Sequence, residues 1–350
     1  MQVILGLLYH TIGGVFSGSF YMPFNRVKGW AWESYWIVGG LFSWLLVPPL
    51  AAWLTVPDFP GIIAAGDSGV KSITFGMGLL WGIGGLTYGL GVRYLGMSLG
   101  NSVVLGFCSA FGALVPSIYY TFNPVAGKVS FTDLLGTRGG QLVLLGVLVC
   151  LVGIAILGRS GMLKESELSE EEKKASVQEF NLVKGLAIAV FSGIMSAFFN
   201  FGIEAGKPLA DAAVRQGGDP LFQNNVTYVV LLWGGLTTNF LWCMYLNFRN
   251  KTFGDYTNPR TPVGANVLFA GIAGTMWFLQ FFFYGMGESK LGNGASSWIT
   301  HMATIILTAN LWGLYLGEWS GVSARTFRTF VVGIVVMLVS IVLVGIGNSL

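Results

Sequence analysis

The stretch that decides the fold of this 350-residue chain is residues 159–184, RSGMLKESELSEEEKKASVQEFNLVK. Eleven of its 26 side chains are charged: Arg159, Lys164, Lys173, Lys174, Lys184, Glu165, Glu167, Glu170, Glu171, Glu172 and Glu179. Long apolar runs lie on both sides of it. Because a charge run of this kind is typical of a solvated loop, we interpret it as a linker between two hydrophobic parts of the chain.

The composition outside this stretch is that of a membrane protein. Hydrophobic residues make up 53% of the chain and charged residues 10%, whereas a soluble domain has roughly 25% charged residues. The mean hydropathy is +0.67. The sequence therefore predicts a polytopic protein of the lipid bilayer. The net charge of +3 comes from basic residues spread over the loops, so no nucleic-acid partner is indicated.

Glycine is abundant, with 51 residues, as expected where small side chains let transmembrane helices approach closely. Four small-residue motifs fit this use: Gly14-x-x-x-Gly18, Gly78-x-x-x-Gly82, Gly85-x-x-x-Gly89 and Gly313-x-x-x-Gly317. Together they predict a packed helix bundle. Cys108, Cys150 and Cys243 all lie in apolar runs without metal-ligand spacing, so we expect small buried core residues.

A membrane-spanning helix needs about 20 apolar residues. The sequence contains ten such ranges: 3–22, 35–56, 72–90, 98–119, 140–157, 185–204, 226–246, 265–285, 294–316 and 329–347. We expect the first to be a retained span rather than a signal peptide, because no basic segment or small-residue cleavage site accompanies it. Pro48 and Pro49 should distort the second span.

Loop charges predict the orientation. The loops after the odd-numbered spans carry more than twice as many Lys and Arg residues as the loops after the even-numbered spans. The positive-inside rule therefore places the odd loops, including residues 159–184, in the cytoplasm and both termini outside.

The two parts of the chain also resemble each other. Short patterns recur in the same order: 16–18 with 191–193, 81–89 with 277–285, 99–101 with 291–293, and the runs from Gly146 and Gly333. Because each part has five spans, the second must be inserted upside down relative to the first, a plan that recurs among secondary transporters. We therefore expect an all-α protein with ten transmembrane helices as two inverted five-helix repeats, residues 1–158 and 185–350, joined by the cytoplasmic linker 159–184.

Ionisable side chains inside spans are costly and tend to mark a transport pathway. The only two histidines, His10 and His301, lie in the first and ninth spans, each about a third of the way along. Both should sit in the outer half of the membrane, where an imidazole can carry a proton near physiological pH. A neutral histidine hydrogen-bonded to a neighbouring helix is the alternative reading of each.

Further polar residues share helical faces near the same depth. Asn200 and Glu204 lie on one face of the sixth span, and Trp277, Gln280 and Tyr284 on one face of the eighth. An aromatic ring beside amides suits a neutral polyol, since the ring covers C–H groups and the amides bind hydroxyls. Two plainer readings remain: the aromatic stripe is packing, and Glu204 with Lys207 forms an i, i+3 pair at a helix end.

At these residues the chain resembles a known family. YMPFNRVKGW (21–30), WGIG (81–84), RYLGMS (93–98), EFNL (179–182), MWFLQFFFY (276–284) and SWITHM (297–302) are similar to motifs of the L-rhamnose-proton symporter family, within the drug/metabolite transporter superfamily. The resemblance covers the whole chain. It implies ten helices, a bacterial inner-membrane location and uptake of L-rhamnose with a proton. His10, Arg93, Lys207, Gln280 and His301 match the family pattern.

Two departures fall near the expected binding chamber. Asn200 and Glu204 stand where the family is expected to have small or neutral polar residues, and residues 292–294 shorten the approach to Ser297. They bear on which sugar is carried. The candidate substrate-binding residues are Asn200, Trp277, Gln280, Tyr284, Trp298, Trp81 and Tyr88; the candidate proton-coupling residues are His10, His301 and Glu204; the candidate structural or gating residues are Arg93 and Lys207.

We therefore predict a secondary active transporter that imports L-rhamnose with a proton by alternating access. The alternative is a transporter of the same fold for another sugar or small metabolite, including an exporter. An integral-membrane enzyme is disfavoured, because the sequence has no paired-Asp motif, no H-E-x-x-H and no G-x-S-x-G. The expected partners are the sugar, the proton and the lipid bilayer. No cofactor is expected beyond the proton as coupling ion, and the oligomeric state is left open.

Overall fold

The computed structural model describes residues 1–95, 97–124, 128–167, 182–315, 319 and 321–350. All the regular elements in these ranges are helices: α1 (Gln2–Ser19), α2 (Tyr21–Phe24), α3 (Trp32–Gly40), the π-helix η1 (Leu41–Leu46), α4 (Val47–Thr55), α5 (Phe59–Ala65), α6 (Ser68–Leu95), α7 (Met97–Phe122), α8 (Phe131–Gly136), α9 (Arg138–Glu167), α11 (Leu182–Ala205), α12 (Lys207–Arg215), the 3₁₀ turn η2 (Pro220–Phe222), α13 (Asn225–Asn250), the 3₁₀ turn η3 (Phe253–Thr257), α14 (Val263–Leu291), α15 (Gly294–Tyr315) and α16 (Ala324–Ser349).

Nine helical segments of the described chain are long and apolar enough to cross a membrane. They coincide with nine of the expected ranges and identify a multi-span α-helical membrane protein. The range 294–316 falls on α15, which is a helix but does not belong to the nine. Its Ser297, Thr300, His301 and Asn310 lower its hydropathy. α9 continues to Glu167, into the predicted linker, and residues 168–181 of that linker lie outside the described part.

The second span departs from α-helical geometry where its prolines were expected to distort it. The turn before Pro48 is the π-helix η1, in which Val47 N–H bonds to Phe42 O, five residues back. Pro48 and Pro49 lack an N–H and crowd the preceding turn, so a wider turn there accommodates them. The segment then continues as α4 to Thr55.

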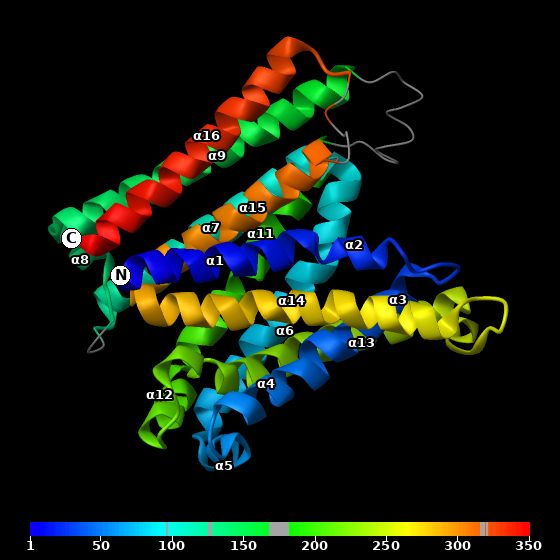
Figure 1. The fold of residues 1–350 in the computed structure, drawn as a ribbon, viewed down its shortest axis with the longest axis horizontal. Coiled ribbons are helices and arrows are strands. Elements are labelled where there is room, and N and C mark those ends of the chain that lie inside the picture. The colour runs from blue at the N-terminus through cyan, green and yellow to red at the C-terminus, as the bar shows by residue number, and fades with distance from the viewer. Residues whose placement is uncertain (96, 125–127, 168–181, 316–318, 320) are drawn as a thin grey trace.

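The first helix of each half of the chain packs against the other half. α1 lies along α14 and α15, whereas α11 lies along α6 and α7. α13 packs on α6 and on the α3–η1–α4 segment, and α9 pairs with α16 along one edge of the bundle (Figure 1). The two halves, residues 1–167 and 182–350, are thus interlocked rather than side by side.

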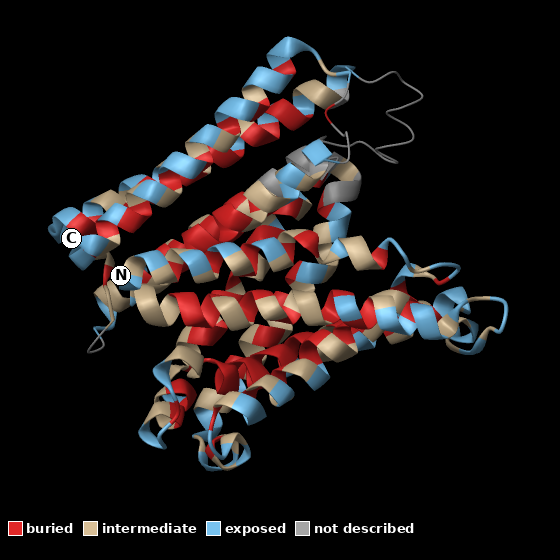
Figure 2. Ribbon diagram, viewed as in Figure 1, coloured by how far each residue is buried: buried red, intermediate tan, exposed pale blue. Residues whose placement is uncertain are grey.

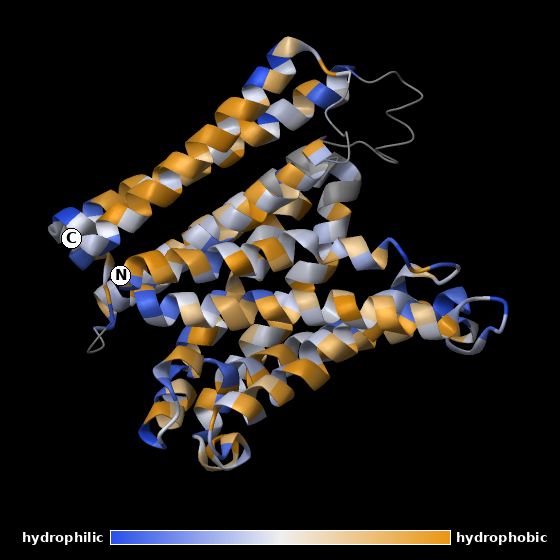
Figure 3. Cartoon of the chain, viewed as in Figure 1, coloured by the Kyte–Doolittle hydropathy of each residue, from blue (hydrophilic) through white to orange (hydrophobic). Residues whose placement is uncertain are grey.

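Burial follows this arrangement. Figure 2 shows buried residues concentrated in the central helices, and Figure 3 shows α9 and α16 as strongly apolar along their length. The outward side of α16 exposes a series of large apolar side chains: Val331, Val335, Leu338, Val342 and Ile346. An exposed apolar face of this length fits contact with lipid. Cys108, Cys150 and Cys243 are buried as expected.

Only some of the glycine motifs lie at helix contacts. A Cβ added to Gly14 would lie 2.3 Å from Thr304 Oγ1 on α15, and one added to Gly78 would lie 2.0 Å from Leu231 O on α13. Gly85 and Gly89, by contrast, have no such neighbour within 4 Å. Gly317 lies outside the described residues, so its motif cannot be placed. The motif pattern therefore predicts close packing without showing which pair achieves it.

Hydrogen bonds of the Glu167 side chain connect the end of α9 with the start of α16. Its carboxylate accepts hydrogen bonds from Ser323 Oγ (2.5 Å), Thr326 Oγ1 (2.5 Å) and Ser323 N (2.7 Å). The Ser323 hydroxyl, then the Thr326 hydroxyl and the Ser323 amide, hold the pKa of the Glu167 carboxyl below its usual value. The folded state therefore favours the ionised form of this group.

Gly78→Ala and Gly85→Ala, in the same helix, should have opposite effects. The methyl group at 78 meets the α13 backbone, so we expect a loss of about 1–3 kcal/mol of unfolding free energy. The methyl group at 85 meets open space, so the better helix propensity of alanine should leave stability unchanged or raise it by up to about 1 kcal/mol. Denaturant titration in detergent micelles tests this; equal losses would contradict the packing described.

Glu167→Gln should lower the melting temperature at neutral pH and lower it by a smaller amount at acidic pH. A carboxyl with a depressed folded-state pKa contributes stability above its unfolded value of about 4.3, and loses it as the pH falls through the folded value. The difference in melting temperature between wild type and variant should therefore shrink over that window. Thermal scans at a series of pH values measure it, and a pH-independent difference would argue against the carboxylate cap.

Candidate functional site

α14 carries a row of candidate site residues along its buried side. Trp277, Gln280, Tyr284 and Glu288 follow one another at intervals of three or four residues, so they lie on one face of the helix. Gln280 and Tyr284 are buried, and Gly274 continues the row toward the start of α14. This face of α14 therefore passes from an aromatic environment at Trp277 to a polar one at Glu288.

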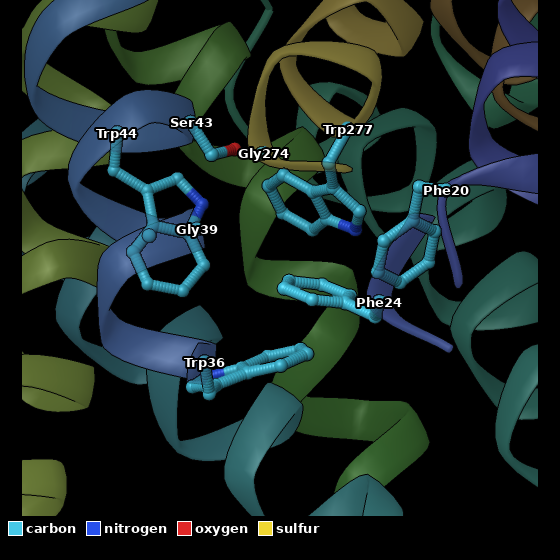
Figure 4. Close-up of a pocket in the computed structure, with 9 residues that line it drawn as sticks. Phe20, Phe24, Trp36, Gly39, Ser43, Trp44, Gly274 and Trp277 are labelled. Carbon is cyan, nitrogen blue, oxygen red and sulfur yellow. The ribbon is translucent and has the colours of Figure 1, made fainter. Parts of the chain in front are cut away.

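The aromatic end of the row opens into a small pocket, shown in Figure 4. Its lining residues come from the junction of α1 and α2, from α2, α3 and η1, and from α14: Phe20, Phe24, Trp36, Gly39, Gly40, Ser43, Trp44, Gly274 and Trp277. The Trp44 and Trp277 rings face each other edge to face, with centroids 5.7 Å apart. The pocket volume is about 10 Å³, roughly what one water molecule needs. In this conformation it is closed to a sugar.

Two hydrogen-bonding groups in the pocket are available to a ligand. Ser43 Oγ and Trp44 Nε1 are buried and have no hydrogen-bond partner among the described residues. Trp36 Nε1, in contrast, donates to Asn239 Oδ1 at 3.0 Å. Because a buried donor without a partner is costly, the first two groups mark places where a ligand hydroxyl could bind. The sequence analysis did not propose Trp36, Trp44 or Ser43 as binding residues, because it is tertiary packing that brings them to the same pocket as Trp277.

A continuous set of ring contacts leads from the pocket toward the centre of the bundle. Trp277 contacts Trp81 (5.3 Å between centroids), and Trp81 contacts Phe199 (5.2 Å). Phe199 in turn lies 6.4 Å from Trp298, which lies 5.8 Å from Tyr284. The structure thus brings three of the predicted aromatic residues, Trp81, Trp277 and Trp298, into one wall.

The two histidines meet beside this wall. The His10 and His301 rings lie 5.7 Å apart, and Tyr284 lies 5.3 Å from the first and 5.2 Å from the second. Both are completely buried, and their ring nitrogens have no hydrogen-bond partner within the described chain. A Cβ on Gly287 would lie 2.7 Å from His10 Nε2, so glycine there makes room for the ring. The sequence predicted the two histidines at the same depth in the membrane, and in the fold their rings are neighbours.

A short chain of hydrogen bonds connects α14 with α11 and α7. The Tyr284 hydroxyl donates to Asn200 Oδ1 (3.2 Å), and Asn200 Nδ2 donates to Gly112 O on α7 (2.6 Å). Trp298 Nε1 donates to Cys108 O on the same helix (2.9 Å). A Cβ at Gly112 would lie only 2.1 Å from Trp298 Nε1, so the close approach needs glycine. Asn200 and Tyr284, predicted from separate helices, are therefore direct partners.

Charged residues gather where α11 and α14 end. Glu204 contacts Lys128 and accepts a hydrogen bond from the Tyr120 hydroxyl (2.9 Å). Lys207 instead bonds to Gln223 Oε1 (3.0 Å) and lies 3.4 Å from Asp211. The alternative reading of Glu204 and Lys207 as an i, i+3 pair is therefore wrong, since each has another partner. The partner of Glu204 comes from a distant loop that the sequence pattern did not connect to it.

Glu288 is a further member of this group that the sequence analysis missed. It accepts a hydrogen bond from Asn224 Nδ2 at 2.6 Å. A Cβ on Gly294 would lie 3.1 Å from Glu204 Oε1 and 4.0 Å from Glu288 Oε1, so the two carboxylates share one neighbourhood. The helical spacing from Tyr284 to Glu288 was the signal that could have identified it.

Two predicted residues stand apart from this site. Tyr88 packs with Val103, Val104 and Ala189, in a cluster separate from that of Trp277. The side chain of Arg93 lies outside the described residues, so its predicted role is not placed. No group of three His, Cys, Asp or Glu side chains that could hold a metal ion occurs in the described part of the chain.

Comparison with known proteins identifies relatives over the full length. The family model described as L-rhamnose-proton symport protein matches residues 1–349. Proteins named L-rhamnose-proton symporter from Cronobacter sakazakii and Pectobacterium carotovorum are each 37% identical over 352 residues, which cover 99% of this chain and 98% of each relative. The protein of that name from Klebsiella pneumoniae is 36% identical with the same coverage.

Tyr284→Phe should destabilise the protein, whereas Tyr228→Phe should not. Both tyrosines are completely buried, but only the Tyr284 hydroxyl has a partner, Asn200. Removing it leaves the Asn200 oxygen without its donor, at a cost of about 1–3 kcal/mol, whereas removing an unpaired hydroxyl is neutral or stabilising. Denaturant titrations of both variants in micelles give the comparison. An unaffected Tyr284→Phe variant would rule out the bond as a structural tie.

Proposed function

Because this chain belongs to the L-rhamnose-proton symporter family, we propose that it imports L-rhamnose together with a proton across the bacterial inner membrane. Members of this family are transporters rather than enzymes, and the proton serves as coupling ion without a further cofactor. The observation that carries the proposal is the row on α14. It joins an aromatic pocket at Trp277, the amide of Gln280 and the Tyr284–Asn200 pair to the buried histidines.

The proposed architecture has ten transmembrane helices in two inverted repeats, residues 1–158 and 185–350, with α15 as the ninth span. Its helix contacts support a two-fold relation: α1 with α14 and α15 corresponds to α11 with α6 and α7, and α7 with α9 corresponds to α15 with α16. Within the α9–α16 pair, a Cβ at Gly146 would meet Val344 and one at Gly333 would meet Leu157. The same two-fold relation pairs Gly146 with Gly333 and Leu157 with Val344, so it converts the first contact into the second.

The proposed orientation has both termini outside and the linker 159–184 in the cytoplasm. Both termini lie at the same end of the bundle, together with α8 and α12 (Figure 1). Basic side chains such as Arg26, Lys28, Arg249 and Lys251 belong to segments at the opposite end. The positive-inside rule favours that end as the cytoplasmic one.

The sugar would bind beside Trp277 and extend along α14. The rings of Trp277 and Trp44 would cover its C–H face, while Ser43, Gln280 and Asn200 would bind its hydroxyls. The present pocket is too small for a hexose, so binding requires that the halves move and separate these rings. This is the behaviour expected of alternating access, with a site at the interface of two repeats. Trp81 and Trp298 extend the same aromatic wall, whereas Tyr88 lies in a separate cluster.

The coupling proton would be taken up by the ionisable groups at the end of the bundle that holds the termini. The candidates from the sequence are His10, His301 and Glu204: the two histidine rings lie beside Tyr284, and Glu204 lies near Glu288 at the end of α14. Lys207, held by Asp211 and Gln223 at this end, would help to fix the mouth of the pathway. Arg93 retains its proposed gating role on the basis of the family pattern alone.

The direct test is purified protein in liposomes. L-rhamnose added outside should drive protons into the lumen, and L-fucose and L-mannose should do so less. Proton entry with rhamnose would establish cargo and coupling together. If folded protein moved protons only with another of these sugars, the rhamnose assignment would be wrong and the site would belong to that sugar.

Trp277→Leu should weaken rhamnose uptake about tenfold, since an aromatic platform is worth about 0.5–1.5 kcal/mol beyond the area it buries. Trp242→Leu is the matched control, because Trp242 lies on the exposed side of α13, away from the pocket. Initial uptake rates over a range of sugar concentrations measure both variants. Equal effects of the two changes would remove Trp277 from the binding site.

A further inference from the structure

The ionisable groups around the end of α14 differ in how well each can accept a proton. The His10 and His301 rings are completely buried, face each other at 5.7 Å and have no acidic partner within the described chain. Adding a proton to either would place a cation in an apolar site beside a second imidazole. In this conformation both are therefore neutral.

Glu204 has a cation of its own. Lys128 contacts its carboxylate directly, and the Tyr120 hydroxyl donates to the same oxygen at 2.9 Å. The side chains of this ion pair are only 20% and 15% exposed. A lysine left partly buried without its carboxylate is costly, so the contact with Lys128 commits Glu204 to an ion pair.

Glu288 has no ion-pair partner among the residues that the structure describes. Its hydrogen-bond partner is the neutral amide of Asn224. Lys128 is bound to Glu204, and Lys207 is bound to Asp211 and Gln223. Two carboxylates in one neighbourhood cannot both ionise freely, and the proton goes to the one with the weaker counter-charge. That residue is Glu288.

A second feature points to the same place. The Tyr228 hydroxyl is completely buried and has no hydrogen-bond partner among the described residues. It lies 3.0 Å from the position of a Cβ on Gly285, beside the Asn224 side chain that holds Glu288. A tyrosine hydroxyl beside the Asn224 side chain can exchange hydrogen bonds with its amide, directly or through a water, when the charge of Glu288 changes.

Glu288 is also connected to the proposed sugar site. It lies one helical turn after Tyr284, which bonds to Asn200, and next to Gly287, against which His10 packs. A change of charge at Glu288 therefore acts on the turn of α14 that orients the sugar-binding amide. The titratable groups that face it are Glu204 of α11, Lys207 of α12, Tyr228 of α13, His10 of α1 and Lys128.

We infer that Glu288, beside Glu204 in its ion pair with Lys128, is the residue that takes up the coupling proton from the side of the termini, and that the two buried histidines position α14 without carrying the proton. This inference rests on the proposed function. The step is a reversible proton transfer: the Glu288 carboxylate accepts a proton as the sugar binds from outside, and releases it to water when the site faces the cytoplasm. One positive charge thus crosses with each neutral sugar.

The test uses Glu288→Gln in liposomes, with Asp67→Asn as a control at an exposed carboxylate, where asparagine can still accept the bond from Val70 N. Glutamine keeps an oxygen for Asn224 and cannot release a proton. The Glu288→Gln variant should still exchange labelled rhamnose across the membrane, but a pH gradient should no longer drive accumulation, a loss of at least tenfold. Asp67→Asn should accumulate like wild type. Accumulation by Glu288→Gln at the wild-type level would overturn the inference.

A cargo-free measurement separates this inference from the proposed function. Infrared difference spectra of the reconstituted protein, recorded against pH without sugar, should show in wild type the carbonyl band of one buried protonated carboxylic acid, resolved from the bands of the exposed carboxyl groups. The band should be absent in Glu288→Gln and should appear at lower pH in Glu204→Gln, which lacks the negative neighbour. A band that persists in Glu288→Gln would refute the assignment whatever the cargo. Absence of rhamnose exchange in wild type would instead refute the proposed function.

Discussion

The structure depends on the packing of the first helix of each half into the other half. α1 lies against α14 and α15, and α11 lies against α6 and α7, so neither half can bury its polar groups alone. In a bilayer such groups must be satisfied within the protein, because lipid offers no hydrogen bonds. Gly14 allows the close approach of α1 to α15 and Gly84 that of α6 to α11, and the Tyr284–Asn200–Gly112 hydrogen bonds join α14, α11 and α7.

This interlocking accounts for the position of the site. α14 packs against α1 on one side and against the α3–η1 segment on another, and its buried face meets an aromatic pocket at one level and a charged mouth at another. A movement of one half relative to the other must change both levels together, because one rigid helix carries them. Coupling between sugar and proton then needs no separate signalling element. The closed pocket at Trp277 and Trp44 fits a conformation in which the sugar site is collapsed.

Much of the fold could be predicted from hydropathy, since each expected range coincides with a helix. Periodicity also placed Asn200 and Tyr284 on faces that proved to meet. Periodicity could not predict which residues on different helices contact each other. Trp44 and Glu288 become visible only when α14 is set against η1 and α13, and nothing in the spacing distinguishes Gly78, at a contact, from Gly85, in open space.

The measurement that tests the central claim most directly is the accumulation of rhamnose driven by an imposed membrane potential, with no pH gradient. One charge crossing 100 mV is worth about 2.3 kcal/mol, which corresponds to an inside-to-outside sugar ratio of about forty to fifty. The account predicts a ratio that rises tenfold for each further ~60 mV, inside negative. A ratio that stays at one at all potentials, in protein that still exchanges rhamnose, would show that sugar and charge do not cross together.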